Sequence, residues 1–335
     1  MTTQRPPAVL AEGVDAGIPW HFGDPLGEQR ALATRAGVVD RSNRDVLRVS
    51  GPERLEWLHT ICSQHVSDLR DGDSTEALIL SPRGHVEQHW QVTELGDVVW
   101  IDTEPGAAPV VLDYLQKMRF LKRVEPEDVS AGWGVLSLVG PSTPDVLAAA
   151  GLPVPDPRHA LPLPAGGFVR RMTWPGVDAA DVVLPRDAVP ALLAALVAAG
   201  AEPAGSWAFE AMRVSARRPR LGFETDHRTI PHEVGWIGSA VHLQKGCYRG
   251  QETVARVQNL GSPPRRLVRM LLSGDADVLP VPLTPVLLAG REVGFIGTAV
   301  HHYDDGPIAL AVIKRSVADD AELQVAGSSV SVDTS

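Results

Sequence analysis

The chain has 335 residues, of which 44% are hydrophobic and 21% are charged, a composition typical of soluble globular proteins. This length exceeds one ordinary hydrophobic core, so we expect two or three domains. The formal net charge of −10 argues against direct nucleic-acid binding through a broad basic surface, because phosphate neutralisation supplies most of such affinity.

The expected compartment follows from cysteine use and from the start of the chain. Two cysteines cannot form a disulfide framework, and such scarcity is typical of a reducing compartment. Residues 1–7 lack the charged and apolar regions of a signal peptide. No apolar run approaches the roughly 18 residues that span a bilayer. We therefore expect a cytoplasmic protein that does not associate with membranes.

The first part of the chain alternates between helix and strand patterns. Residues 1–25 show no periodicity and predict an extended arm, followed by a helix over 26–35 with Gly37 in the position of a C-cap. A helix after Gly51-Pro52 carries an apolar stripe that ends in Cys62, which we expect to lie in the core. The other predicted elements are strands over 45–50, 76–80, 85–93 and 97–102 and a helix over 111–118.

The next part of the chain repeats this order of patterns. A strand over 135–139 leads into Gly140-Pro141, which opens a helix as Gly51-Pro52 does earlier. A strand over 181–184 then precedes a helix over 188–199, as a strand precedes a helix in the first part. Two landmarks in the same order indicate an internal duplication. Mixed strands and helices of this kind predict an α+β fold with largely antiparallel sheets.

The end of the chain shows a different pattern. Gly261-Ser262-Pro263-Pro264 predicts a linker. Beyond it come short strand patterns separated by Gly, Pro and Asp, which fit a compact all-β terminal domain. These strands are predicted over 266–272, 286–288, 292–299 and 308–313.

A short stretch before this linker concentrates groups that carry chemistry. Cys247 stands close to Lys245 and Arg249, and adjacent cations stabilise the thiolate, which is the nucleophilic and metal-binding form of a thiol. We expect the Lys245 side chain to lie at the surface. Gly246 and Gly250 bracket the cysteine and let the backbone turn tightly. The helix predicted after this turn directs free N–H groups toward the loop. A surface turn with an incidental cysteine is the alternative interpretation.

A run of arginines stands out against the acidic composition. Arg213, Arg217, Arg218 and Arg220, with Arg228 close behind, suit either the solvated face of a helix or a site for a small anion such as a carboxylate tail. The histidines match no standard ligand spacing, so we predict no metal site.

The cysteine stretch resembles the signature of one protein family. A Lys-Gly-Cys-aromatic-x-Gly-Gln-Glu run followed by Ala-Arg is typical of the YgfZ branch of the folate-binding family that includes the glycine cleavage T-protein. Here that run stands complete, and the resemblance extends over the middle of the chain and the C-terminal barrel. By this resemblance Cys247 is the reactive thiol, and the signature loop comprises Lys245, Gly246, Tyr248, Arg249, Gly250, Gln251, Glu252 and Arg256.

The resemblance implies a fold and a ligand. The fold is α+β, with three domains in a ring around a central hole that accepts tetrahydrofolate or a derivative. A folate-binding region, 1–261, would hold duplicated α/β lobes over about 45–128 and 133–240 and the signature segment 241–261, and a C-terminal all-β barrel would occupy 263–335. A role in iron–sulfur protein maturation, and through it in tRNA methylthiolation, is also implied.

Two departures from the aminomethyltransferases of this family bear on the chemistry. Those enzymes carry a pair of aspartates where this chain has Glu87 and Gln88, and Gln88 replaces the aspartate credited with the chemistry. An amide cannot stabilise a cationic iminium or move a proton. Ser215 replaces their pterin-binding glutamate. We therefore do not expect a classical aminomethyltransferase.

The expected folate contacts combine these positions with the arginine run. Gln88 is one expected folate contact. Glu233 is the nearest carboxylate that could replace the missing glutamate and accept from the N–H donors of a pterin. A salt bridge between Glu233 and a nearby arginine is the other interpretation. Arg213, Arg217, Arg218 and Arg220 are expected to neutralise part of a polyglutamate tail.

The leading hypothesis is a tetrahydrofolate-binding accessory protein in iron–sulfur cluster assembly or repair, with folate and iron–sulfur proteins or their assembly factors as partners. A cluster ordinarily takes about four thiolates, so Cys247 would share a cluster with a partner or act by transient exchange. The alternative is a folate-dependent one-carbon (aminomethyl) transferase in which Cys247 or Glu252 does chemistry. A third hypothesis is an RNA-modification subunit that touches tRNA itself.

Overall fold

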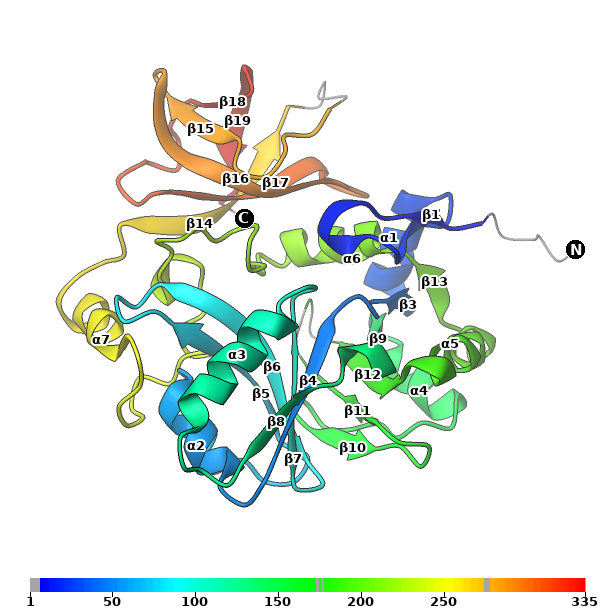
Figure 1. Ribbon diagram of the computed structural model, residues 1–335. Coiled ribbons are helices and arrows are strands. Elements are labelled where there is room, and N and C mark those ends of the chain that lie inside the picture. The colour runs from blue at the N-terminus through cyan, green and yellow to red at the C-terminus, as the bar shows by residue number, and fades with distance from the viewer. Residues whose placement is uncertain (1–6, 173–174, 176–177, 274–277, 335) are drawn as a thin grey trace, which may run out of the picture. The chain divides into compact units, whose positions relative to one another are not determined.

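The computed structural model describes residues 7–172, 175, 178–273 and 278–334 (Figure 1). The chain divides into two compact units. The first unit comprises Met1–Ile61, His65–Ala77 and His89–Met212, and the second comprises Cys62–Gln64, Leu78–Gln88 and Arg213–Ser335. This division differs from the predicted boundary near residue 262, because the second unit already begins at Arg213 and also includes two short segments from the first half of the chain. The predicted domain boundaries stay a prediction.

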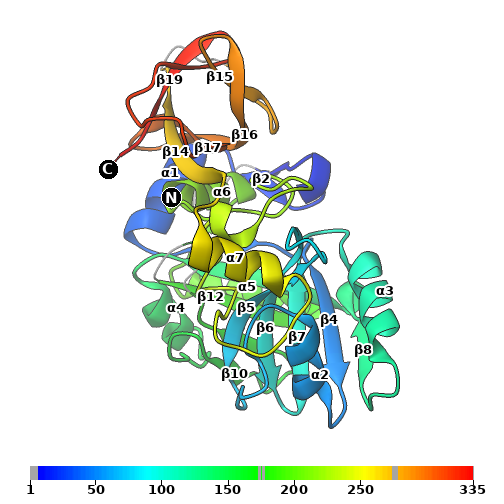
Figure 2. The same ribbon diagram turned by 90° about the vertical axis from the view of Figure 1, so that its left-hand side faces the viewer.

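The first lobe contains a five-stranded sheet in the order β5-β6-β7-β4-β8. Its elements are β4 (Asp45–Ser50), α2 (Arg54–Ile61), β5 (Ser74–Leu80), β6 (Val86–Leu95), β7 (Val98–Thr103), α3 (Ala108–Arg119) and β8 (Glu125–Asp128). Figure 2 shows β5, β6, β7 and β4 side by side in this order. Neighbouring strands β4 and β7 pair antiparallel, with Asp45 opposite Thr103 and Ser50 opposite Val98. The antiparallel pairing agrees with the sequence prediction.

The second lobe repeats this element order. Its elements are β9 (Trp133–Val139), α4 (Thr143–Ala149), β10 (Ala160–Pro162), β11 (Phe168–Arg170), β12 (Ala179–Pro185), α5 (Val189–Ala198) and β13 (Glu202–Ala204). The sheet order β10-β11-β12-β9-β3-β13 matches that of the first sheet except for the inserted β3 (Gly37–Asp40). The internal duplication predicted from Gly-Pro landmarks is therefore confirmed.

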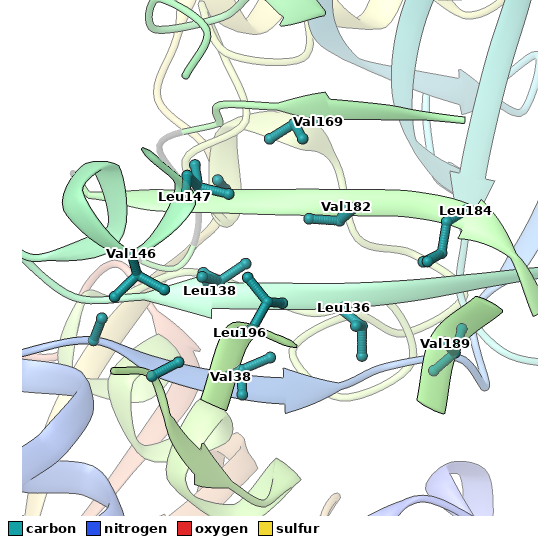
Figure 3. Close-up of a cluster of buried hydrophobic side chains, with 13 residues drawn as sticks. Val38, Leu136, Leu138, Val146, Leu147, Val169, Val182, Leu184, Val189 and Leu196 are labelled. Atoms are coloured by element: carbon teal, nitrogen blue, oxygen red, sulfur yellow. The ribbon is translucent and has the colours of Figure 1, made fainter. Parts of the chain in front are cut away.

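The second sheet buries a continuous aliphatic cluster. Leu147 of α4 and Leu196 of α5 pack with Leu138 of β9 and Val182 of β12 (Figure 3). All four side chains are 0% exposed. Burying an aliphatic side chain of this size stabilises the fold by about 1.5–3 kcal/mol, so the cluster holds both helices on the sheet.

The N-terminal residues differ from the prediction. Val9–Leu10 (β1) and Pro19–His21 (β2) pair antiparallel, although no periodicity indicates them. Helix α1 (Pro25–Thr34) forms as expected. Gly37 does not cap this helix but starts β3. A Cβ at position 37 would lie 2.3 Å from the Leu32 Cδ1 atom, so a larger residue there would have to displace the buried Leu32 side chain of α1.

Buried ion pairs join the two sheets of the first unit. Arg44 of the first lobe donates to Asp102 at 2.7 Å, and Arg170 of β11 pairs with both Asp102 and Asp181. Burial alone would raise the pKa of the Asp102 carboxyl, but Arg170 and Arg44 outweigh it and lower that pKa to about 2. Asp102 therefore stays ionised in the interior and connects β7 to β11.

The C-terminal strands close into a barrel in the order β14-β17-β16-β15-β18-β19 (Figure 2). The strands are β14 (Arg265–Leu272), β15 (Pro285–Leu288), β16 (Arg291–His302), β17 (Gly306–Lys314), β18 (Leu323–Val325) and β19 (Ser328–Val332). The predicted all-β barrel is confirmed, with β18 and β19 added to the four predicted strands. In the part of the chain that the structure describes, no helix has the length and hydrophobicity needed to cross a membrane.

Candidate functional site

The Cys247 loop is held between two inward-facing side chains. Lys245 and Tyr248 are buried, whereas Gly246 and Cys247 between them are exposed. Tyr248 belongs to a hydrophobic cluster that includes Trp236, and burial raises the pKa of its phenol to about 12. The loop therefore presents its thiol at the surface while its flanking residues are anchored inside the second unit.

The loop also rests on the turn between β5 and β6. Gly250 has a φ of +84°, and a Cβ there would lie 2.6 Å from the Ser81 carbonyl oxygen. Gly84 in that turn has a φ of +77°, and its Cβ would lie 2.7 Å from the Thr253 Cβ atom. Positive φ and close contact both require glycine at these positions. A Cβ at Gly246 would meet no described atom within 4 Å, so no steric reason for glycine exists there.

Helix α7 (Gln251–Leu260) follows the loop, as predicted. Gln251 turns its amide back and donates to the Lys245 carbonyl oxygen at 3.4 Å. Glu252 and Arg256 are exposed on the helix. The signature residues therefore fall into two groups, one that fixes the loop and one that faces solvent.

The two cations expected to stabilise a Cys247 thiolate are engaged with other groups. Arg249 forms an ion pair with Glu87 of β6 at 3.2 Å. Lys245 is 5% exposed, and its Nζ donates to the carbonyl oxygens of Cys62 at 2.7 Å and Gln64 at 3.2 Å. The expectation that the Lys245 side chain lies at the surface is therefore wrong, because its ammonium is enclosed against these two carbonyls.

The second cysteine lies in the interior. Cys62 directly follows α2, is 2% exposed, and places its Sγ 3.5 Å from the Gln64 carbonyl oxygen. Burial raises the pKa of this thiol, and the nearby Lys245 ammonium offsets only part of that effect. The predicted core position of Cys62 is confirmed. Cys247 is the exposed thiol of the chain.

Gln88 on β6 has a buried oxygen. The side chain is half-buried, and its Oε1 has no hydrogen-bond partner among the described residues. Leaving a buried acceptor without a donor costs about 1–3 kcal/mol. An N–H group of a bound molecule would therefore be stabilised at this atom.

Arg213 occupies the last turn of α6 (Ser206–Ser215) and is completely buried. Its guanidinium donates to the Glu224 carboxylate at 2.9 Å, to the Arg218 carbonyl oxygen at 2.7 Å and to the Thr298 hydroxyl. Such an arginine holds three segments of the second unit together. This burial contradicts the predicted contact of Arg213 with a carboxylate tail arriving from solvent.

The rest of the arginine run lies beyond that helix. Because α6 ends at Ser215, the helix-face interpretation is wrong for Arg217, Arg218 and Arg220. Arg217 is 43% exposed and its Nη2 lies 3.6 Å from the Asp333 carboxylate. Arg218 is half-buried. Arg217 and Arg218 thus have the exposure that an anion site needs, and their contact with a folate tail stays a prediction.

Glu233 forms a bidentate ion pair. Its two carboxylate oxygens each accept from Arg265 at 2.8 Å, and Oε2 also accepts from the Ile230 N–H at 3.1 Å. The salt-bridge interpretation is confirmed, although the arginine comes from β14 instead of the run before Glu233. Ser215, which was noted above as replacing a pterin-binding glutamate, accepts a hydrogen bond from Arg269 at 3.5 Å.

Sequence reasoning missed the acidic partners of these arginines. Glu224 is fully buried against Arg213, and Asp226 accepts from Arg265 at 2.7 Å. Both stand in a segment without periodicity, so no sequence signal identifies their partners. Among the described residues, no three His, Cys, Asp or Glu side chains are grouped so as to hold a metal ion.

A family model identifies the relatives of this chain. The model described as the GCVT N-terminal domain matches residues 8–245, more than two-thirds of the chain. The chain belongs to this family. The GCVT match runs through both lobes and ends at Lys245 of the signature loop.

The GCVT relatives include aminomethyltransferases. The enzyme of Thermus thermophilus is 28% identical over 324 residues, which cover 93% of this chain and 89% of the relative. The enzyme of Parasynechococcus marenigrum is 27% identical over 333 residues, which cover 92% and 88%. Among solved structures, the glycine cleavage system aminomethyltransferase T of Bartonella henselae matches with a TM-score of 0.87 at 20% identity, covering 98% of this chain and 93% of that one. The last likeness confirms the mixed α/β T-protein fold with its C-terminal barrel.

Proposed function

We propose that this GCVT-family protein binds a tetrahydrofolate derivative and transfers its one-carbon unit. The family match and the aminomethyltransferase relatives support the proposal. The structural observation that carries it is the buried Gln88 Oε1, which has no hydrogen-bond donor among the described residues. A pterin ring presents adjacent ring and amino N–H donors, so it offers the kind of group that this oxygen accepts.

The bound folate would supply the one-carbon unit, and the protein would bind and orient it. Gln88 would accept a hydrogen bond from the pterin. Arg217 and Arg218 would neutralise carboxylates of the tail, because their guanidinium groups are donors that match a carboxylate. Cys247 and Glu252, both exposed, are the groups available to act on the carried unit or on its acceptor.

Gln88 also limits the chemistry. An amide neither carries a negative charge nor accepts a proton near neutral pH, so it cannot replace a catalytic aspartate in acid–base work. Glu233 does not compensate, because Arg265 occupies both of its oxygens. Any proton transfer that accompanies one-carbon transfer must therefore use a group other than Gln88.

A second function is favoured by Gln88 together with Cys247. A complete YgfZ-type signature around an exposed thiol, combined with an amide in place of the catalytic carboxylate, suits an accessory protein in iron–sulfur cluster assembly or repair. Because Cys62 is buried, Cys247 is the thiol that would meet a partner. A cluster ordinarily takes about four thiolates, so an iron–sulfur protein or assembly factor would supply the others. Support of tRNA modification would then be indirect.

A turnover assay separates the two functions. The purified protein is incubated with methylene-tetrahydrofolate and candidate amine acceptors, and released tetrahydrofolate is quantified beside the Gln88→Asp variant, which restores a carboxylate. Gln244→Asp, at the exposed position directly before the signature loop, is the matched control. Turnover by the wild-type protein supports the transferase. Binding without turnover, with activity gained only in Gln88→Asp, favours the accessory function.

A further inference from the structure

We propose that Lys245 is a positioning residue that closes the Cys62–Gln64 segment against the Cys247 loop, so that the chain exposes one thiol and shields the other. From the sequence, Lys245 is expected to have a different role, that of a surface cation beside Cys247. The contacts that Lys245 makes lie inside the second unit, and none of them involves folate or a cluster.

The Lys245 ammonium bridges two carbonyl groups of a bent segment, Cys62–Gln64. The carbonyl oxygens of Cys62 and Gln64, two residues apart, both accept from the Lys245 Nζ, at 2.7 and 3.2 Å. The carbonyl of Ser63 between them accepts instead from the His242 N–H at 3.1 Å. One ammonium therefore serves two of the three carbonyls of this bend, and the His242 N–H serves the third.

The middle residue of the segment is fixed by other groups. Ser63 donates its N–H to the Leu78 carbonyl at 2.9 Å and its hydroxyl to the Ala240 carbonyl at 2.6 Å. The carbonyls of Cys62 and Gln64 have the lysine as their charged donor. Removing that donor takes a charge-assisted hydrogen bond away from two buried acceptors, and the segment regains hydrogen bonds by opening to water. Such opening exposes the Cys62 thiol.

A lysine suits this position for a specific reason. Its ammonium carries three donors on a compact charge, so it can serve two carbonyls at once, whereas a thioether of similar length offers none. The Nζ also lies 5.1 Å from the centre of the Tyr248 ring. Lys245 and Tyr248 thus contact each other beneath Cys247, and the lysine fixes both sides of the exposed loop.

The test is native-state alkylation of the two cysteines, each followed on its own peptide by mass spectrometry. In Lys245→Met, Cys62 alkylation is expected to rise at least about tenfold and to stay nearly independent of urea below the unfolding transition, because local opening exposes little surface. Cys247 alkylation is expected to stay within about twofold of wild type, with the same pH midpoint, because the thiol is already exposed. Lys245→Arg, which restores donors, is expected to bring Cys62 protection most of the way back.

Two control variants separate this role from general destabilisation. Gln244→Met changes the exposed neighbour in the loop and is expected to leave both rates unchanged. Leu138→Ala removes core packing in the first unit, so any rise in Cys62 alkylation there should depend steeply on urea. Should Lys245→Met fail to fold, Lys245→Gln, which keeps amide donors without the charge, is expected to give an intermediate Cys62 rate.

Three results would overturn the proposal. If Cys62 is alkylated as slowly in the Lys245 variants as in wild type, the lysine does not hold the segment closed. If the rate of Cys62 alkylation in Lys245→Met rises with urea as steeply as it does in Leu138→Ala, Lys245 contributes only to overall stability. If Cys247 is alkylated more slowly in Lys245→Met, and the pH midpoint of this reaction is raised, Lys245 acts on the Cys247 thiol as a stabilising cation.

Discussion

Replacing Arg213 by methionine should destabilise the C-terminal unit severely. The variant removes the Arg213 ion pair of the Glu224 carboxylate, which is 0% exposed, together with the donors to the Arg218 carbonyl and the Thr298 hydroxyl. Breaking a buried ion pair by removing one partner costs about 3–5 kcal/mol. At about 2–4 °C of melting temperature per kcal/mol for a domain of 150–250 residues, the expected loss is about 6–20 °C.

Differential scanning calorimetry of the full chain measures this loss. Arg228→Met is the matched control. The Arg228 side chain is 68% exposed, and its ion pair with Asp226 is long, with 3.9 Å between nitrogen and oxygen. Because such exposed pairs contribute little, the melting temperature of this variant should stay close to that of wild type. The double variant Arg213→Met/Glu224→Leu should recover part of the loss, because it also removes the buried carboxylate that Arg213 pairs with. An Arg213→Met protein that melts like wild type but binds polyglutamylated folate poorly would refute this reasoning and restore Arg213 as a ligand contact.

Three further predictions follow from single positions. Gly250→Ala should cost about 1–3 kcal/mol in urea unfolding because the left-handed backbone there disfavours a side chain, whereas Gly246→Ala should be close to neutral; equal costs would contradict this. Arg217→Ala/Arg218→Ala should weaken polyglutamylated folate more than the monoglutamate form in a binding titration, and equal losses would assign these arginines to structure. The folded-state pKa of Asp102 is lowered to about 2, so its ionised form contributes about 2 kcal/mol to the free energy of unfolding above its ordinary pKa of 3.8. This contribution should be lost as pH falls from 4 to 2, and a free energy of unfolding that is flat over this range would contradict the prediction.

The elements that sequence predicted well are those whose pattern is local. The strand Asp45–Ser50 has its predicted bounds, since its alternation alone defines a half-buried strand. The three-residue strand Glu202–Ala204 was not predictable, because its sequence Glu-Pro-Ala does not alternate and its place is set by parallel pairing with β3. Short strands of this kind are defined by distant partners.

The same distinction holds for the candidate site. The signature drew attention to Cys247, which is the exposed thiol, and the apolar stripe placed Cys62 in the core, because both inferences use neighbouring residues. The direction of the Lys245 side chain was missed because its acceptor, the Cys62 carbonyl, is 183 residues away in the chain. Likewise the sequence shows that Arg213 is charged but does not show which carboxylate meets it.

Folate binding by the wild-type protein tests the central claim most directly. Isothermal titration with a stable tetrahydrofolate derivative is compared with Gln88→Leu, which removes the buried acceptor at similar size, and with Gln244→Leu at an exposed position. The account predicts saturable binding that Gln88→Leu weakens about tenfold, as the loss of one buried hydrogen bond implies, and that Gln244→Leu leaves unchanged. Wild-type protein that shows no saturable binding of any tetrahydrofolate derivative, while its melting curve shows a folded chain, would contradict it.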